Sequence, residues 1–378
     1  MSASLGLIDW GVIGLYALGV VGVAVWSSRR TSEDHDPFLA GRRVSPVLVA
    51  MSLVATALSG ATFLGGPEQS YRGDLTYLIG QVAEVLAIVL VAFVFLPRYY
   101  KARVTTVYEI IGARYGGGAQ RTVSGVFMMG RVLASGSRLF LAALAVALIL
   151  FGTSQSFWAV LGAVVIISVV ACLYTLTGGI RAVIWTDAAQ LCVLLLGAGV
   201  AIWILLGRIP LSTGELVQVL RTPDPETGQA KATIVARGFD LSVDFSLWSA
   251  LTGLLLFNLA AFGTDQDLMQ RMLTCSSKGK AAASALLSKV IGFGAVAVFL
   301  TLGLLLWVYY QRPDVMGDAA PAVAPVAGVE VFLGFILQDL MKGTVEIHRN
   351  DGLVESIAPL TESELYPAHR PAQRFADL

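Results

Sequence analysis

The sequence predicts an all-α, polytopic membrane protein whose helices cross the bilayer about eight times. Hydrophobic residues make up 56% of the 378 residues and charged residues only 14%, whereas a soluble domain carries nearer a quarter charged residues. The mean hydropathy is +0.73, and the apolar residues gather into runs long enough to span hydrocarbon as helices. The net charge of zero gives no reason to expect a nucleic-acid partner.

The spans follow from these runs, and the loops between them predict the orientation. We expect spans at residues 10–26, 46–71, 75–96, 122–152, 157–176, 185–206, 245–262 and 281–310. Lys and Arg concentrate in alternate loops, namely 27–45, 97–121, 178–184 and 263–280. The positive-inside rule makes these loops cytoplasmic. The chain is therefore predicted to be a multi-pass protein of the cell (plasma or inner) membrane with its N-terminus outside.

The second span is expected to be interrupted. Residues 59–67 read SGATFLGGP, which combines hydroxyls with glycines and a proline that weaken a helix. Lipid cannot satisfy the backbone groups of a broken helix, so they must be buried in protein or line a polar cavity. Such helices form the ion and substrate sites of secondary transporters. The alternative is a regular helix whose small residues allow close packing. We expect unwinding or a kink between Ser59 and Pro67.

The membrane domain is predicted to cover residues 1–344. Within it, residues 311–344 form an external loop with a short amphipathic helix at 329–342. Residues 345–378 form a polar tail that contains no run long enough to span a bilayer. This tail is a genuine extension, is disordered, or results from a shifted reading frame.

Several stretches together carry a family resemblance. They are FLAGRR, MSLVATALSGATFLG, FLPRYYKARVTTVYEIIGARYG, YTLTGGIRAVIWTDAAQ and GTDQDLMQRMLTCSS. With them the chain resembles the sodium:solute symporter family, which includes sodium–glucose, sodium–proline, sodium–iodide and vitamin symporters. The resemblance covers roughly residues 8–344. It implies an inverted-repeat, LeuT-like core of five plus five helices, here incomplete, with sodium as coupling ion and no other cofactor.

The resemblance also implies a sodium site and its exit path. It places the backbone carbonyls of Ala55 and Leu58 at the site, and oxygen ligands suit this hard cation. The alternative is that both are ordinary helix carbonyls. Asp187 matches an aspartate on the sodium exit path of the family. A carboxylate at a helix N-terminus, favoured by the helix dipole, is a second explanation for Asp187.

Polar side chains inside the spans are the candidates for substrate binding. Ser59 and Thr62 offer hydroxyls at the interruption, or serve helix packing. Gln81 and Glu84 lie one turn apart on one helix face. A carboxylate inside an apolar span is expected to face the bundle interior, and the resemblance places both residues at substrate-contacting positions.

Two arginines and two further polar residues complete this set. Arg131 and Arg138 share one face of the fourth span, where they either pair with a carboxylate such as Glu84 or bind an anion. If they face the cavity, the substrate carries a carboxylate, because a guanidinium binds one bidentately. Asn258 matches a sugar-contacting asparagine of the family. Lys289 lies near a substrate-contacting lysine, unless it snorkels to the cytoplasmic face.

One departure from the sugar symporters concerns the inner gate. Ala261 stands where they carry a gating tyrosine, so the resemblance does not extend to sugar specificity. Phe257 or Phe262 is the candidate gate instead.

These observations predict a secondary active transporter in which sodium drives the uptake of a small organic solute by alternating access. Sugars, amino acids, carboxylates and vitamins are all compatible substrates. The alternatives are a passive facilitator or a truncated relative that is a fragment, sensor or scaffold, and we expect this chain alone to show no sodium-driven uptake. The sequence contains no Walker A motif, Ser/His/Asp set or metal-ligand cluster, so an enzyme is not expected.

Overall fold

The computed structural model describes residues 38–336 except 59, 152–155, 224–227, 236–244 and 322–330, together with parts of 10–26. The described residues form helices joined by loops, with one isolated β-bridge between Pro223 and Ala230. Five of the helices are long and apolar enough to cross a membrane, or six if a bent pair counts as one span. The predicted all-α class of multi-pass membrane proteins is confirmed. The tail at 345–378 lies outside the described residues.

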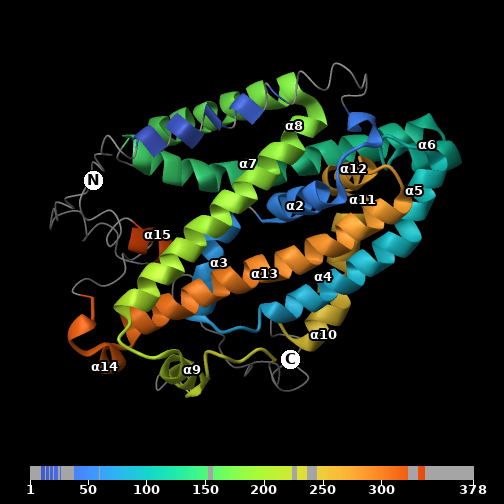
Figure 1. The fold of residues 1–378 in the computed structure, drawn as a ribbon. Helices are drawn as coiled ribbons and strands as arrows, with labels where there is room; N and C mark the ends of the chain where they lie inside the picture. The colour runs from blue at the N-terminus through green and yellow to red at the C-terminus, as the bar shows by residue number, and fades with distance from the viewer. Residues whose placement is uncertain are drawn as a thin grey trace, which may run out of the picture.

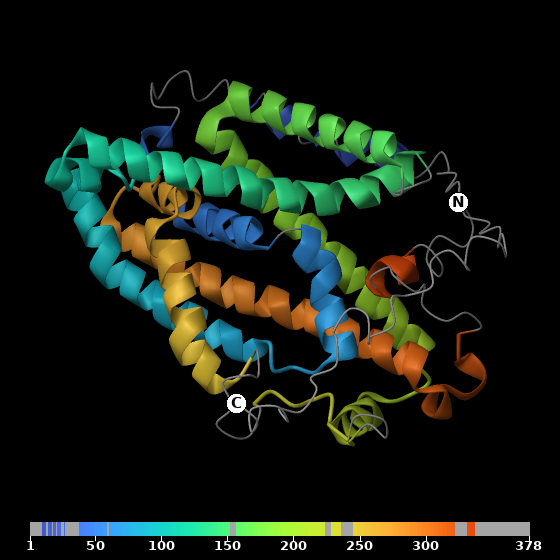
Figure 2. The same cartoon turned by 180° about the vertical axis from the view of Figure 1, so that it is seen from behind.

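The helices run in this order along the described chain (Figures 1 and 2): η1 (Ala40–Arg42), α2 (Pro46–Ala57), α3 (Gly60–Arg72), α4 (Leu78–Leu90), the π-helical η2 (Val91–Phe95), α5 (Leu96–Ala102), α6 (Glu109–Tyr115), α7 (Gly117–Phe151), α8 (Phe157–Arg208), α9 (Thr213–Arg221), α10 (Leu247–Ser249), the π-helical η3 (Ala250–Leu254), α11 (Leu255–Thr264), α12 (Gln266–Leu273), α13 (Lys278–Gln311), α14 (Pro313–Met316), η4 (Gly317–Ala319) and α15 (Val331–Phe335).

The second span is broken, and the break lies at its Leu58 end. The helices α2 and α3 meet at an angle of 64°, and Leu58 between them has an extended backbone with φ −84° and ψ 110°. Ser59 lies outside the described residues. The part of the prediction that placed unwinding as far as Pro67 is wrong, because α3 continues through Gly65, Gly66 and Pro67.

Packing against α13 explains why Pro67 does not break α3. The side chain of Ser70 donates hydrogen bonds to the carbonyls of Pro67 (3.2 Å) and Leu300 (2.7 Å). Gly303 of α13 lies so close that a Cβ added there would be 2.0 Å from the Pro67 carbonyl oxygen. Neighbouring helices and hydroxyl side chains often accommodate proline within a spanning helix in this way.

The turn predicted at Gly178-Gly179 is a sharp bend inside α8. Gly179 has φ 57° and ψ −162°, a backbone conformation that glycine adopts without steric cost. Figure 1 shows the consequence: the first part of α8 runs beside α7 as an upper layer, and the second part crosses down toward α13. Much of the apolar surface of α7 is exposed, as at Met129 and Leu133, which suits a helix surrounded by lipid.

The core lies along α13. This helix packs against α2, α3, α4 and α8, and its buried side chains belong to a large cluster that includes Phe299 and Trp307. A second cluster, around Leu53 and Met272, joins α2, α5 and α12 to the beginning of α13. Both halves of the broken helix therefore pack against α13. The last turn of α2, before the bend, shares the lining of a cavity with residues of α7 and α11.

Candidate functional site

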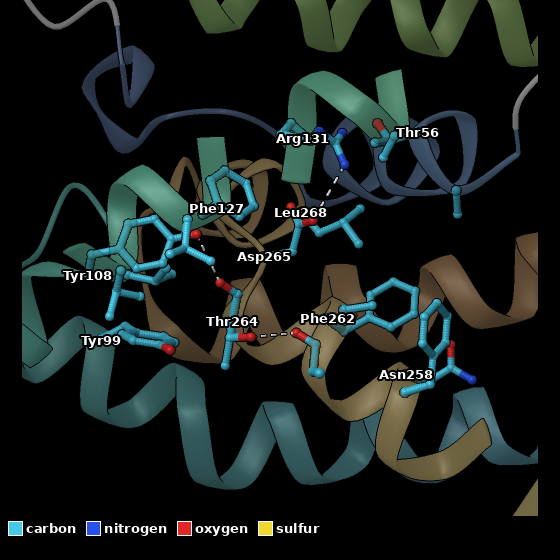
Figure 3. A pocket seen from close by; sticks show the side chains of 18 of the residues that line it. Thr56, Tyr99, Tyr108, Phe127, Arg131, Asn258, Phe262, Thr264, Asp265 and Leu268 are labelled. Carbon is cyan, nitrogen blue, oxygen red and sulfur yellow. Dashed lines mark hydrogen bonds and ion pairs between the residues drawn. The ribbon is translucent and has the colours of Figure 1, made fainter. Parts of the chain in front are cut away.

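A cavity of about 840 Å³ lies between α2, α4, α6, α7 and α11 (Figure 3). Loop residues around Tyr108 line one end, and Thr56, Glu84 and Asn258 reach it from the middle of their spans. The wall is largely apolar and aromatic, with a few convergent polar groups, which is the usual composition of a small-molecule site. Its charged lining residues are Glu84, Arg131, Arg138 and Asp265.

The predicted sodium ligands lie at the end of α2. Because α2 ends at Ala57, the carbonyls of its last turn lack the amides that a continuing helix would supply. The Leu58 amide still donates to Val54 O at 2.7 Å. Thr56 and Ala57, from the same turn, line the cavity. The backbone oxygens of Ala55 and Leu58 therefore lie in the turn that reaches the cavity, and their role as sodium ligands stays a prediction.

Asp187 forms a network with α2 and α12. Its Oδ2 accepts hydrogen bonds from Ser52 Oγ (2.6 Å) and from Arg271 Nη2 (3.2 Å) and Nε (3.3 Å). Thr56 Oγ1 lies 3.5 Å from the same oxygen. The alternative explanation of Asp187 by a helix dipole is wrong, because Asp187 is two turns beyond the bend at Gly179 and the dipole effect is confined to the first turn.

Sequence reasoning missed the role of Arg271 in this network. Its signal was present in the stretch GTDQDLMQRMLTCSS, which was used only for the family resemblance. Arg271 and Ser52 are both buried, so their hydrogen bonds to the Asp187 carboxylate are protected from water.

Glu84 and Lys289 form an ion pair across α4 and α13. The Lys289 Nζ lies 2.9 Å from Glu84 Oε2 and 3.7 Å from the centre of the Phe262 ring. Lys289 is only 8% exposed, so it does not snorkel to the membrane surface. Glu84 lines the cavity, and its partner in this structure is Lys289 rather than either arginine of α7. Gln81 is buried one turn before Glu84 and does not line the cavity.

The two arginines of α7 both line the cavity but differ in their contacts. Arg131 forms an ion pair with Asp265 at 3.4 Å (Figure 3) and a second one with Asp267. Arg138 forms neither a hydrogen bond nor an ion pair with any of the residues that the structure describes. The contacts of Arg131 agree with the predicted pairing to a carboxylate. For Arg138, anion binding stays a prediction.

The other predicted residues are divided between the cavity and its surroundings. Asn258 is buried and lines the cavity, together with Ala261 and the two candidate gating phenylalanines, Phe257 and Phe262. Phe262 carries Lys289 on its ring face. Thr62 is half-buried on α3 and does not line this cavity.

The corner between α11 and α12 is held by side chains of α5, of Asp265 and of the turn before α6. Tyr99 donates to Gly263 O at 2.8 Å, and the Asp265 carboxylate accepts from the Asp267 amide at 2.8 Å, as an N-cap does. Burial raises the pKa of Tyr108 to about 12, so its phenol keeps the proton that it directs to Thr264 O at 3.5 Å.

A helix broken beside a central cavity, within a bundle of apolar spans, defines the class of secondary transporters with interrupted helices. The chain belongs to the Sodium:solute symporter family, whose model matches residues 38–328. It is 27% identical over 314 residues to the human sodium/iodide cotransporter, covering 82% of this chain and 46% of the relative. It is 28% identical to the sodium/sialic acid symporter SiaT of Proteus mirabilis, covering 81% and 60%.

A solved structure supports the fold. The substrate-bound, outward-open state of a Na⁺-coupled sialic acid symporter superposes with a TM-score of 0.72 at 24% identity, covering 88% of this chain and 66% of that one. The predicted LeuT-like class is confirmed by this match. The chain spans about half the length of the curated relatives it matches.

Proposed function

We propose that this chain takes part in sodium-coupled symport of a small organic anion, and that the anion carries a carboxylate. This proposal rests on which of the charged residues that line the cavity have an ion-pair partner and which do not. Glu84 is paired with Lys289, and Arg131 is paired with Asp265. Arg138 alone among the charged lining residues has no partner in the described chain. A guanidinium in that position matches a carboxylate in both charge and geometry.

Two features support sodium as the coupling ion. The last turn of α2 borders the cavity through Thr56 and Ala57, and this turn contains the backbone oxygens of Ala55 and Leu58, which supports a sodium site there. Thr56 lines the cavity and lies 3.5 Å from the Asp187 carboxylate, which supports an exit path for the ion past Asp187. The two curated relatives are named for iodide and sialic acid, both of which are anions near neutral pH.

Further polar residues are assigned to the same site. Asn258 lines the cavity and offers an amide to the uncharged part of the substrate. Glu84 lines the cavity and is paired with the buried Lys289 behind it, so we assign the two to the substrate site as one neutral pair. Thr62 and Gln81 stay predictions without a place in the lining of the cavity, and Ser59 stays a prediction outside the described residues.

A binding measurement tests the proposal. The purified protein is titrated with sialic acid and with short monocarboxylates, in sodium and in potassium buffer. We expect a carboxylate to bind in sodium only, and Arg138→Gln to weaken it by about 1.5–3 kcal/mol, the contribution of a hydrogen bond to a charged group. Arg138→Lys should retain part of the affinity.

The matched control is Arg121→Gln, which removes a guanidinium from an exposed position on the same helix, away from the cavity. It should bind like the unchanged protein. Equal affinity for a carboxylate and its neutral amide would contradict the assignment of an anionic substrate. Sodium-independent binding would favour a passive facilitator instead.

A further inference from the structure

A cluster of cations surrounds the contact between the end of α5 and the beginning of α13. The Tyr100 hydroxyl lies 2.7 Å from Cys275 O and 3.1 Å from Met272 O, and so joins two segments far apart in the sequence. Exposed cations flank both sides of this contact: Lys101, Arg103, Lys278 and Lys280. A fifth cation, the guanidinium of Arg42, lies over the Tyr100 ring at 5.4 Å.

The four exposed cations have no carboxylate partner in the described chain. Their side chains form no ion pair or hydrogen bond there, whereas the cations deeper in the bundle, such as Arg271 and Lys289, are paired. Unpaired charges close together repel one another, so this cluster produces a positive potential that attracts an anion. The cluster is built from two segments that the fold brings together.

Exposed apolar side chains, called here the apolar strip, lie further along the helices that carry these cations. The helices α4, η2 and α5 run next to α13 in the opposite direction (Figures 1 and 2), and they are joined by the Glu84–Lys289 pair. The exposed apolar residues are Leu90 of α4 and Phe93 of η2, and Leu286 and Val290 of α13. Val290 is ten residues after Lys280, which is about 15 Å along a helix and half the thickness of the hydrocarbon core.

We propose that this surface binds an anionic phospholipid of the surrounding bilayer. The phosphate lies among Lys101, Arg103, Lys278 and Lys280, and the acyl chains lie along the strip of α4, η2 and α13. The apolar faces belong to helices long enough to cross a membrane, and their side chains match the acyl chains of a lipid in chemistry. Basic surfaces between spanning helices on the cytoplasmic side bind anionic headgroups, and both loops are on the side that the positive-inside rule makes cytoplasmic.

The lipid would act on the relative position of the two helices. The same two helices carry the ion pair of Glu84, which lines the cavity, and Lys289. A headgroup bound between the end of α5 and the start of α13 would add a second interaction between these helices, besides the Glu84–Lys289 ion pair. The proposal is independent of which solute the cavity accepts.

Native mass spectrometry and thermal unfolding of the purified protein test this site. The protein in neutral detergent is titrated with phosphatidylglycerol, phosphatidylcholine and, as a headgroup without acyl chains, glycerol 3-phosphate. The test variant is Lys101→Gln/Lys280→Gln, which removes one charge from each segment. The control is Arg114→Gln/Arg121→Gln, which removes two exposed cations from the same predicted side, away from the cluster.

We expect phosphatidylglycerol to bind and to raise the unfolding temperature, and the other two compounds to do neither. Each juxtamembrane cation contributes about a factor of five to such binding, so the test variant should bind about 25-fold more weakly. The control and Lys101→Arg/Lys280→Arg should bind as the unchanged protein does, and salt should weaken all binding. Equal binding of phosphatidylcholine, equal protection by glycerol 3-phosphate, or an unchanged affinity in the test variant would overturn the proposal.

Discussion

The ion pair between Glu84 and Lys289 should contribute strongly to the stability of the bundle. Lys289 is almost fully buried, and its ammonium is held only by the Glu84 carboxylate and the Phe262 ring in the described structure. The substitution Lys289→Met preserves the length of the apolar stem and removes the charge. It leaves the Glu84 carboxylate, which is 25% exposed, without a counter-ion inside the span.

The expected loss in the free energy of unfolding follows from what is known of buried ion pairs in general. Removing one partner of such a pair costs about 3–5 kcal/mol, because the remaining charge is uncompensated. Glu84 borders the cavity and keeps some contact with water, so Lys289→Met should lie near 3 kcal/mol. Glu84→Gln should lower the free energy of unfolding more, because the Lys289 ammonium, then without its partner, is the more deeply buried of the two charges. The double variant Glu84→Gln/Lys289→Met should recover part of the loss.

The assay is reversible unfolding in mixed micelles of neutral and denaturing detergent, followed by tryptophan fluorescence. The four proteins form a double-mutant cycle, which isolates the coupling energy between the two side chains. The control is Lys280→Met, which removes an exposed lysine from the same helix and should change stability by less than about 0.5 kcal/mol. Additive costs, or single variants as stable as the control, would refute the assignment of a stabilising pair.

Two further predictions concern close packing and pH. Gly303→Ala should disrupt the packing of α3 on α13, because the new Cβ would collide with the Pro67 carbonyl. Gly294→Ala should be tolerated, because an added Cβ there has no neighbour within 4 Å. The yield of monodisperse protein in size-exclusion chromatography checks both expectations. Burial raises the pKa of Cys275 from 9.0 to about 11. The folded thiol therefore keeps its proton where the unfolded thiol loses it, so the stability that it contributes is present below pH 9 and lost as the pH rises toward 11. Cys275→Ser should reduce this decline in a pH series of thermal unfolding.

The sequence predicts periodic and compositional features of this fold well, because they depend on local residues. The all-α class and the interruption of the second span both follow from runs of apolar residues and from helix-weakening ones. The position of the break is harder to predict. Gly65, Gly66 and Pro67 are as strong a local signal as the residues around Leu58, yet α3 passes through them as a helix. Its stabilisation comes from Leu300 and Gly303, more than 200 residues away.

The charged residues show the same limit. Helix periodicity correctly places Arg131 and Arg138 on one face, and both line the cavity. It cannot name their partners, because ion pairs between spans depend on which helices are neighbours. Glu84 pairs with Lys289, 205 residues later, and Arg131 with Asp265, 134 residues later. Arg138 is distinguished from Arg131 only by such contacts, and therefore only by the structure.

The short helix α12 connects the two charge networks around the cavity. At its beginning, Asp265 and Asp267 hold Arg131 of α7, and one turn later Arg271 holds Asp187 of α8. Thr56, at the end of α2, contacts the same carboxylate and lines the cavity. A displacement of α12 relative to α7 and α8 would act on all three ion pairs, whose partners lie on different helices. Since α12 follows directly on α11, which carries Asn258 and Phe262, this short helix connects the cavity wall with the network around Asp187.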